Sequence, residues 1–402
     1  DGWCSLFKKK IGETEYGIGW LPLGGYVKIS GMIDESMDKE QMAQPPKPYE
    51  FRSKTSLQRL LIMTGGVMVN FVLALVIYVL VLYTWGETYL PVQNMTYGIW
   101  VDSTGYEIGL RNGDKILSID GKEVENYRSI VHDIVVDQAS TVQIERNNRI
   151  VELELPSNTI STLLKSELPI LPRMPFYIGN IAGNDSMAYK SGIRENDRLI
   201  AINNVSTDFF DQFKEEIKNY RGQDAQITVL RNETDTLNLM VPVSEEGTIG
   251  VAADLDLNRF FELKTKKYSL AASVPAGISK GFKMIDSYLK QMKLLFQPET
   301  QAYKEIGGFL KIGSIFPGQW NWQDFWNLTA FLSIILAIMN ILPIPALDGG
   351  HVMFLLYEII SGRKPGEKFL EYAQIAGMVL LIALLLYANG NDLVNLFNKY
   401  FN

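Results

Sequence analysis

The sequence predicts a polytopic α-helical membrane protein with soluble α+β domains inserted between its spans. Three stretches contain no Asp, Glu, Lys or Arg, at residues 60–83, 325–347 and 372–391. The intervening residues 84–324 have the ordinary composition of a soluble protein, and they contain an internal repeat. Long uncharged runs that alternate with charged, repeat-bearing sequence favour membrane spans joined to folded domains.

Each uncharged stretch is long enough to cross a membrane, because a hydrocarbon layer needs about 20 helical residues. We expect the three spans at residues 57–86, 323–347 and 369–391. The second span ends in Pro343 and Pro345, which remove backbone donors and break a helix. A short helix and a cytoplasmic link, residues 348–368, would then lead into the last span.

Basic residues cluster before the first span and between the last two spans. They are Lys8, Lys9, Lys10, Lys28, Lys47, Arg52, Lys54, Arg59, Arg363, Lys364 and Lys368. The positive-inside rule places both clusters on the cytoplasmic side, so we expect region 1–56 to be cytoplasmic. The soluble domains then lie on the opposite side, which in a Gram-negative cell is the periplasm. We therefore expect a multi-pass protein of the bacterial inner membrane.

The charge balance excludes one class of partner. The chain has 38 Lys and Arg against 45 Asp and Glu, a formal net charge of -7, and no basic patch interleaved with aromatic residues. This pattern does not favour nucleic-acid binding. The single cysteine, Cys4, cannot form an intrachain disulfide.

The soluble region contains two copies of one pattern. Residues 109–121, GLRNGDKILSIDG, are echoed by residues 192–204, GIRENDRLIAINN. Self-similarity at a fixed offset indicates repeated structural units. We therefore expect two similar small domains in tandem, at residues 96–170 and 171–262.

Each copy combines strands with one amphipathic helix. Strand-like alternation covers residues such as 141–144 and 226–230, and helical periodicity covers 127–136 and 209–220. This arrangement resembles the PDZ fold, in which a Gly-Leu-x-x-Gly-Asp stretch leads into a strand. PDZ domains capture extended peptides by strand addition, so peptide ligands are one interpretation. A structural repeat without a ligand is the other.

Residues 268–318 form a predicted amphipathic region. Apolar side chains recur at steps of four and three, at Ile278, Phe282, Ile285, Leu289, Met292 and Phe296. Lysines fall between them, so the helix suits a membrane surface, and it suits packing against the two repeats equally well. Aromatic residues then precede and enter the second span, as at a membrane interface; they are Trp320, Trp322 and Trp326.

A carboxylate and an imidazole follow the second apolar run directly. The segment 340–351 reads NILPIPALDGGH and places Asp348 and His351 at expected membrane depth, where ionisable groups are costly and usually functional. Its two prolines free carbonyls that only a protein-lined cavity can satisfy. The alternative is that Asp348 merely caps a helix that starts near His351.

Three segments together resemble the site-2 protease family of intramembrane zinc metalloproteases, in its bacterial regulator-of-sigma-E branch. Residues 340–349 are similar to the family's Asn-x-x-Pro-x-Pro-x-Leu-Asp-Gly signature. Residues 10–28 are similar to its membrane-associated β-hairpin. Residues 66–70, GVMVN, match its Gly-x-x-x-Asn helix motif, with Val67 in place of the usual proline. The order of these segments and the tandem PDZ-like domains agrees over essentially the whole chain.

The resemblance implies roles for particular residues. Asp348 would be the carboxylate ligand of Zn²⁺, and His351 would be structural. The implied substrate-binding residues include the helix motif and the edge strand of the hairpin, on which an unwound substrate is clamped. They are Asn340, Asn70, Gly66, Tyr16, Gly17, Ile18, Gly19, Trp20, Gly24 and Gly25.

The family's His-Glu-x-x-His motif is absent from this sequence, whose two histidines are His132 and His351. In the family this motif lies on a helix before the hairpin, so we expect a fourth, N-terminal span that carries it. The alternative is a catalytically inactive pseudoprotease or membrane-tethered PDZ adaptor. Aspartyl proteolysis needs two acids at membrane depth, and the nearest second acid, Glu358, is expected at the helix surface.

The function implied by the resemblance is regulated intramembrane proteolysis. Substrates would be single-pass membrane proteins already shortened outside the bilayer, such as an anti-sigma factor or remnant signal peptides. The two PDZ-like domains would filter substrates by size over the entrance.

Overall fold

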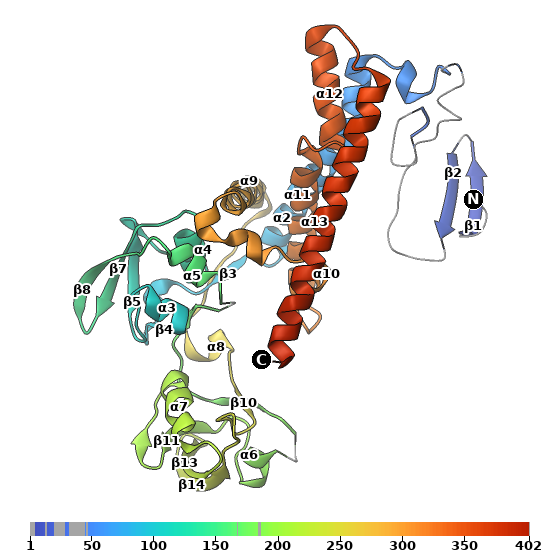
Figure 1. Ribbon diagram of the computed structural model, residues 1–402. Helices are drawn as coiled ribbons and strands as arrows, with labels where there is room; N and C mark the ends of the chain where they lie inside the picture. The colour runs from blue at the N-terminus through green and yellow to red at the C-terminus, as the bar shows by residue number, and fades with distance from the viewer. Residues whose placement is uncertain are drawn as a thin grey trace. The chain divides into compact units, whose positions relative to one another are not determined.

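The structure is a computed structural model that describes residues 5–12, 14–19, 29–31, 45, 47–166, 168–183 and 186–401 (Figure 1). The chain divides into two compact units, residues 1–72 with 335–386 and residues 73–334 with 387–402. Three helical segments are long and apolar enough to cross a membrane, at Ser56–Thr84, Trp322–Ile341 and Lys368–Phe397. These segments overlap the three predicted spans.

The first unit begins with a β-hairpin of β1 (Ser5–Ile11) and β2 (Thr14–Gly19). Phe7 pairs with Ile18 and Lys9 with Tyr16, so these side chains share one face of the hairpin. Phe7, Tyr16 and Ile18 are all exposed. The hairpin therefore presents an uncovered apolar face.

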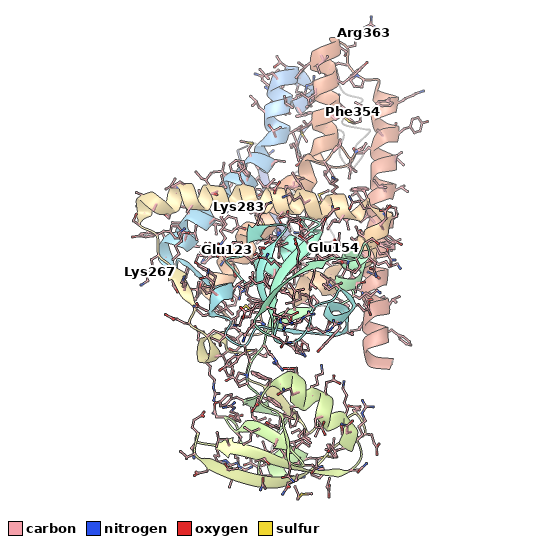
Figure 2. The ribbon with its side chains drawn as sticks, turned by 90° about the vertical axis from the view of Figure 1, so that its left-hand side faces the viewer. Glu123, Glu154, Lys267, Lys283, Phe354 and Arg363 are labelled. Carbon is pink, nitrogen blue, oxygen red and sulfur yellow. The ribbon has the colours of Figure 1, made fainter. Side chains whose placement is uncertain are left out.

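Among the described residues, four helical segments follow the hairpin in the first unit. They are the start of α2 (Ser56–Thr84), the end of α11 (Trp322–Ile341), α12 (Asp348–Ser361) and the first part of α13 (Glu367–Phe401), preceded by the short η1 (Phe51–Ser53). The α11 helix ends before Pro343, as the two prolines predict. Helices α12 and α13 pack together through Phe354 and Phe369, whose ring centroids are 5.8 Å apart (Figure 2).

The expectation that Glu358 lies at the helix surface is wrong. Its side chain is 9% exposed and accepts a hydrogen bond from Arg59 Nη2 at 2.6 Å. The Ser56 hydroxyl donates to the same carboxylate oxygen at 2.9 Å. Arg59 and Ser56 belong to the first turn of α2, and sequence spacing could not reveal partners about 300 residues away. Glu358 therefore has a structural partner rather than a catalytic position.

In the second unit the first repeat forms a four-stranded antiparallel sheet in the order β6-β5-β7-β8, with a two-stranded sheet β4-β9 beside it. Its elements are β4 (Ile99–Val101), α3 (Ser103–Glu107), β5 (Lys115–Ile119), β6 (Lys122–Glu123), α4 (Ser129–Val135), β7 (Thr141–Arg146), β8 (Arg149–Glu154), α5 (Thr159–Leu163) and β9 (Ile170–Pro172).

The second repeat has the same plan, with the orders β12-β11-β13-β14 and β10-β15. Its elements are β10 (Ile178–Ile181), α6 (Met187–Lys190), β11 (Arg198–Ile202), β12 (Val205–Ser206), α7 (Phe210–Glu216), η3 (Ile217–Tyr220), β13 (Asp224–Arg231), β14 (Asp235–Pro242) and β15 (Val251–Ala253). The predicted strands at 141–144 and 226–230 fall within β7 and β13. Sequence repeat and strand order thus agree.

The repeated sequence makes the same ion pair in both copies. Arg146 binds the buried Asp114 at 2.7 Å, and Arg231 binds the buried Asp197 at 2.7 Å. Each arginine also donates to the carbonyl of the first glycine of its motif, Gly109 in the first copy. The turn of each motif therefore carries an aspartate, and the ion pair of this aspartate fixes the end of β7 or β13.

A charged joint connects the two repeats. Arg173 donates to both carboxylate oxygens of Asp211, at 3.0 and 2.7 Å, and Asn112 of the first repeat donates to the same carboxylate at 3.1 Å. Asp211 is buried, so this joint is a desolvated ion pair with a bidentate geometry. It holds the start of α7 against the first repeat.

The segments around the repeats complete the second unit. Strand β3 pairs with β16, and the remaining elements are short except for α9. They are β3 (Glu87–Tyr89), η2 (Val92–Asn94), α8 (Leu257–Phe260), β16 (Lys264–Lys266), α9 (Leu270–Leu295), η4 (Pro298–Thr300), η5 (Ala302–Glu305) and α10 (Phe309–Ser314).

Helix α9 contacts the first repeat, as one of the two interpretations of the amphipathic segment expects: Lys290 binds Asp137 of that repeat at 2.9 Å. The helix also packs against α2, where a Cβ on Gly277 would lie 2.7 Å from the Val79 nitrogen. Part of its apolar stripe stays exposed, with Phe282 at 56%. Its position at a membrane surface stays a prediction.

Candidate active site

The turn between α11 and α12 depends on two glycines that allow close backbone contact. A Cβ on Gly349 would overlap the carbonyl oxygens of Ile341 and Leu342 at the end of α11. A Cβ on Gly350 would lie 2.6 Å from the carbonyl oxygen of Ile344. The Asp-Gly-Gly sequence therefore brings the first turn of α12 against the end of α11, and it fixes the direction in which Asp348 leaves the helix.

Helix α13 supports the same turn from another side. The backbone N–H of Ala346 donates to the side-chain oxygen of the buried Gln374 at 3.2 Å. Ala346 has φ of 82°, a conformation that costs a residue with a Cβ some strain. A Cβ on Gly377 would overlap the carbonyl of Pro345. Sequence reasoning missed these supports, although an isolated amide in an apolar run, such as Gln374, was the available signal.

Asp348 is the first residue of α12 and does not cap a helix that begins near His351. The preceding Leu347 is the N-cap, and it makes no side-chain cap bond. Within the part of the chain that the structure describes, no hydrogen-bond donor reaches the half-buried Asp348 carboxylate. A carboxylate that is partly desolvated and lacks a donor suits a cation, and Zn²⁺ accepts carboxylate oxygen among its four ligands. The site thus fits one ligand of a zinc centre.

Asn340 and Asn70 share this environment. Asn340 lies in the last turn of α11 and Asn70 lies midway along α2, and both side chains are half-buried. Among the described residues neither side-chain amide has a hydrogen-bond partner. Free amides can bond the exposed N–H and C=O groups of an extended peptide.

The Arg59–Glu358 ion pair aligns Asn70 with Asp348 in depth. Asn70 lies about 17 Å along α2 from Arg59, and Asp348 lies about 15 Å along α12 from Glu358, at about 1.5 Å per residue. Both segments run away from the ion pair, because α2 begins there and α12 ends near it. The two side chains therefore reach a similar level within the first unit.

The other implied substrate residues are less constrained. Gly66 is exposed, and a Cβ there would meet no atom within 4 Å, so the structure shows no close helix approach at this position. Tyr16, Gly17, Ile18 and Gly19 lie on β2. Trp20, Gly24 and Gly25 lie outside the described residues. Substrate placement between this strand and Asp348 remains part of the proposal below.

A second group of metal-ligand residue types lies elsewhere. His132, Asp133 and Asp137 place their ligand atoms within 4.8 Å of one another. Each already has a protein partner: His132 contacts Asp133 at 3.2 Å and Ser287 at 2.7 Å, and Asp137 binds Lys290 at 2.9 Å. This group therefore ties the first repeat to α9.

The candidate spans and the half-buried carboxylate are compatible with a membrane-embedded metallopeptidase, and comparison with known proteins shows the family. The sequence matches peptidase family M50 over residues 4–384, so the chain belongs to this family, the site-2 proteases. Regulator of sigma E protease of Haemophilus influenzae is 26% identical, over 98% of this chain and 91% of its own length. Protease RseP of Yersinia pestis is 25% identical, over 94% and 87%. A Treponema pallidum protein described as a "putative zinc metalloprotease" is 27% identical, over 98% and 90%.

This membership establishes the activity in outline. The chain is an intramembrane metalloprotease of the site-2 type, its cofactor is Zn²⁺, and it acts on membrane-protein substrates in a lipid bilayer. The interpretation as an inactive adaptor is not favoured. The residues that perform each role are the subject of the proposal that follows.

Proposed function

We propose that Asp348 is the carboxylate ligand of the catalytic zinc ion and that the chain cleaves transmembrane segments of pre-trimmed single-pass proteins. The observation that carries this proposal is the half-buried carboxylate of Asp348, which accepts no hydrogen bond from the described residues and is held by Gly349 and Gly350 against the end of α11. When bound, zinc supplies an activated water, whose pKa falls toward ~7, and polarises a carbonyl.

The residues of this chain orient the substrate. Asn340 lies in the last turn of α11, before the turn that leads to Asp348, and its free amide bonds the backbone of the segment to be cut. Asn70, at a similar depth on α2, lines the opposite wall. These amides replace the hydrogen bonds that a substrate helix loses when it unwinds, since unpaired backbone groups are costly in an apolar medium.

The hairpin supplies the remaining backbone partners. Strand β2 pairs with β1 along one edge, and an extended substrate adds to the other edge. Gly17 adds no side chain to this strand, and a Cβ there would lie 3.4 Å from the Phe7 carbonyl oxygen. The exposed apolar face with Phe7, Tyr16 and Ile18 supports a position of the hairpin at the membrane surface.

The two repeats select substrates before they enter. They are PDZ-like domains that exclude intact ectodomains by size, and strand β15 is the edge that an extended peptide ligand would join. Anti-sigma factors and remnant signal peptides have the required form, a single span with a short outer segment. The protein resides in the bacterial inner membrane, with the repeats in the periplasm and residues 1–56 and 348–368 at the cytoplasmic side.

Reconstituted vesicles that contain the full-length protein and zinc test this function. A single-span substrate with a short outer segment should be cut within its span, and the same substrate with a folded ectodomain should stay intact. The Asp348→Asn variant should leave both intact, whereas Asp208→Asn, which changes an exposed aspartate of the second repeat, should cut normally. Equal cleavage by Asp348→Asn and the wild type would refute the proposal.

A further inference from the structure

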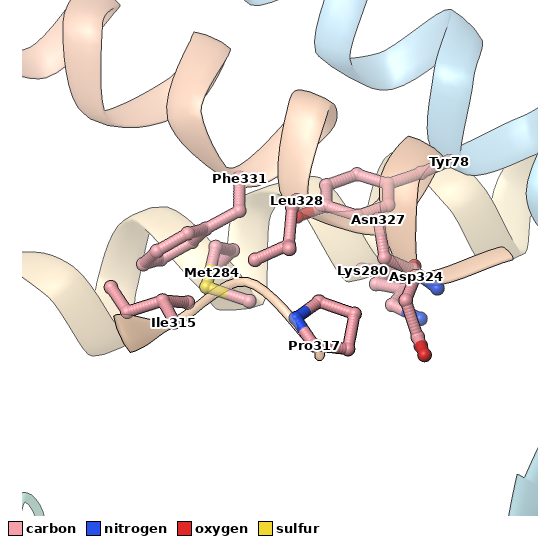
Figure 3. A pocket seen from close by; sticks show the side chains of 9 residues that line it. All are labelled: Tyr78, Lys280, Met284, Ile315, Pro317, Asp324, Asn327, Leu328 and Phe331. Carbon is pink, nitrogen blue, oxygen red and sulfur yellow. The ribbon is translucent and has the colours of Figure 1, made fainter. Parts of the chain in front are cut away.

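A cavity of about 350 Å³ lies between α2, α9 and α11 in the second unit, and none of the residues assigned to proteolysis lines it. Helix α2 contributes Tyr78, α9 contributes Lys280 and Met284, and α11 contributes Asp324 and Asn327 among others (Figure 3). Its volume falls within the range of about 300–1,000 Å³ that is typical of sites for small molecules.

The cavity lies at the level of a membrane interface. Tyr78 is near the C-terminal end of α2, and Asp324 is in the first turn of α11, so the ends of two candidate spans meet there. A cluster of aromatic rings marks the same level at the start of α11, with Trp320 and Trp322 at 5.1 Å between centroids. Tryptophans concentrate at the depth of lipid headgroups.

Tyr78 offers a hydroxyl donor without a protein partner. Its side chain is 1% exposed, and among the described residues no atom forms a hydrogen bond with its hydroxyl. The hydroxyl oxygen itself keeps some accessible surface and lines the cavity, so a ligand there can accept its hydrogen bond. This tyrosine is therefore the polar group that a bound molecule would satisfy.

Lys280 supplies a positive charge to the same cavity. Its ammonium lies 5.5 Å from the centre of the Tyr78 ring and 3.9 Å from the Glu87 carboxylate, which is itself 45% exposed. Burial lowers the pKa of Lys280, and the Glu87 charge partly offsets that effect. An anionic group beside Lys280 and Tyr78 would receive a charged donor and a neutral donor together.

Asp324 and Asn327 add hydrogen-bond acceptors to the cavity. The Asn327 amide nitrogen donates to the Gln323 carbonyl at 3.0 Å, which leaves its side-chain oxygen as an acceptor. Within the described part of the chain no ion pair joins Asp324 to Lys280, although both line the cavity. The lining therefore offers acceptors and donors to one ligand, and Met284 and other apolar side chains complete it.

We propose that this cavity binds the headgroup of a zwitterionic membrane phospholipid that carries a phosphate and a primary ammonium group. Lys280 and Tyr78 hold the phosphate, and Asp324 and Asn327 hold the ammonium. The apolar wall contacts the glycerol and the first acyl carbons. A headgroup held here would link α9 to the outer ends of α2 and α11.

The test uses the full-length protein, delipidated in detergent and titrated with phosphatidylethanolamine, phosphatidylcholine or phosphatidylglycerol. Native mass spectrometry reads bound lipid, and the lipid-dependent rise in melting temperature is a second readout that tolerates variants of lower basal stability. The wild type should bind phosphatidylethanolamine about tenfold more tightly than phosphatidylcholine, whose methylated ammonium cannot donate to Asp324.

Matched variants identify the site. Lys280→Met and Tyr78→Phe should each weaken phosphatidylethanolamine binding, the former by about tenfold. Asp324→Asn should abolish the preference over phosphatidylcholine. Lys283→Met, which removes an exposed lysine from the same helix (Figure 2), should change nothing.

Three results would overturn the proposal. One is equal binding of phosphatidylethanolamine to Lys280→Met and the wild type. Another is tighter binding of the anionic phosphatidylglycerol, which would show that Asp324 plays no part. The third is stabilisation by inorganic phosphate alone that equals the effect of the lipid, because the occupant would then be a free anion.

Discussion

Arg59 Nη2 lies 2.6 Å from Glu358 Oε1, and this ion pair joins the first turn of α2 to the far end of α12. Their side chains are 12% and 9% exposed, so the pair is largely shielded from water. Because the residues proposed for chemistry lie about 15–17 Å farther along each helix, the pair sets the register between Asn70 and Asp348.

Removal of one partner from this pair should therefore impair both folding and cleavage. Glu358→Gln leaves Arg59 without its carboxylate, and an unpaired buried charge costs about 3–5 kcal/mol. The melting temperature and the cleavage rate should both fall. Arg363→Gln, at an exposed residue in the link after α12, should match the wild type. A Glu358→Gln variant with unchanged stability would show that the pair does not hold the helices.

The glycines after Asp348 should tolerate no side chain. Gly349→Ala places a methyl group against the carbonyls of Ile341 and Leu342, so the turn must open and displace Asp348. We expect loss of cleavage and of bound zinc, with a lower melting temperature. Gly366→Ala is the matched control, because no atom lies within 4 Å of its Cβ position. Full activity of Gly349→Ala would disprove this packing argument.

Gln374 should contribute through the backbone of the turn. Gln374→Leu removes the acceptor for the Ala346 N–H, and a buried unsatisfied donor costs about 1–3 kcal/mol. Ala346→Gly should act in the opposite direction, since its φ of 82° suits glycine. The melting temperatures of the two variants, compared with that of the wild type, test whether Gln374→Leu destabilises the fold and whether Ala346→Gly stabilises it. Destabilisation by Ala346→Gly would mean that packing of the alanine methyl group outweighs the backbone strain at this position.

The contact of the first repeat with α9 should depend on pH. The hydrogen bond from His132 to Asp133 raises the pKa of His132, burial and Lys290 oppose this, and the charge of Asp137 adds to it. Because the pKa of His132 is raised in the folded state, its protonation stabilises that state. This stabilisation is fully present below about pH 6.5, the ordinary pKa of histidine. This stabilisation is lost as the pH rises through the raised value.

The comparison with His132→Asn isolates that effect. The melting temperature of the wild type, relative to the variant, should decline between about pH 6.5 and 8. The imidazole is 39% exposed, so solvent screening keeps the decline small. A constant difference across this range would show that the contact with Ser287 does not depend on charge.

The sequence alone predicts the helical spans, the tandem repeat and the proline turn, because each depends on local composition or periodicity. It also predicts Asp348 as a candidate zinc ligand, because a carboxylate beside two prolines and two glycines is unusual at the end of an apolar run, and this role stays a prediction. It could not identify the partners of Glu358 or the support of Ala346 by Gln374. Those contacts join residues that are distant in sequence, and only helix packing brings them together.

Zinc content tests the central claim most directly. The full-length protein, purified without chelators, should contain about one zinc per chain, since one catalytic site holds one ion. Asp348→Asn should lose most of that metal while it keeps the folded state shown by circular dichroism, and Asp208→Asn should retain it. Retention of wild-type zinc by Asp348→Asn would contradict the assignment of Asp348 as a ligand.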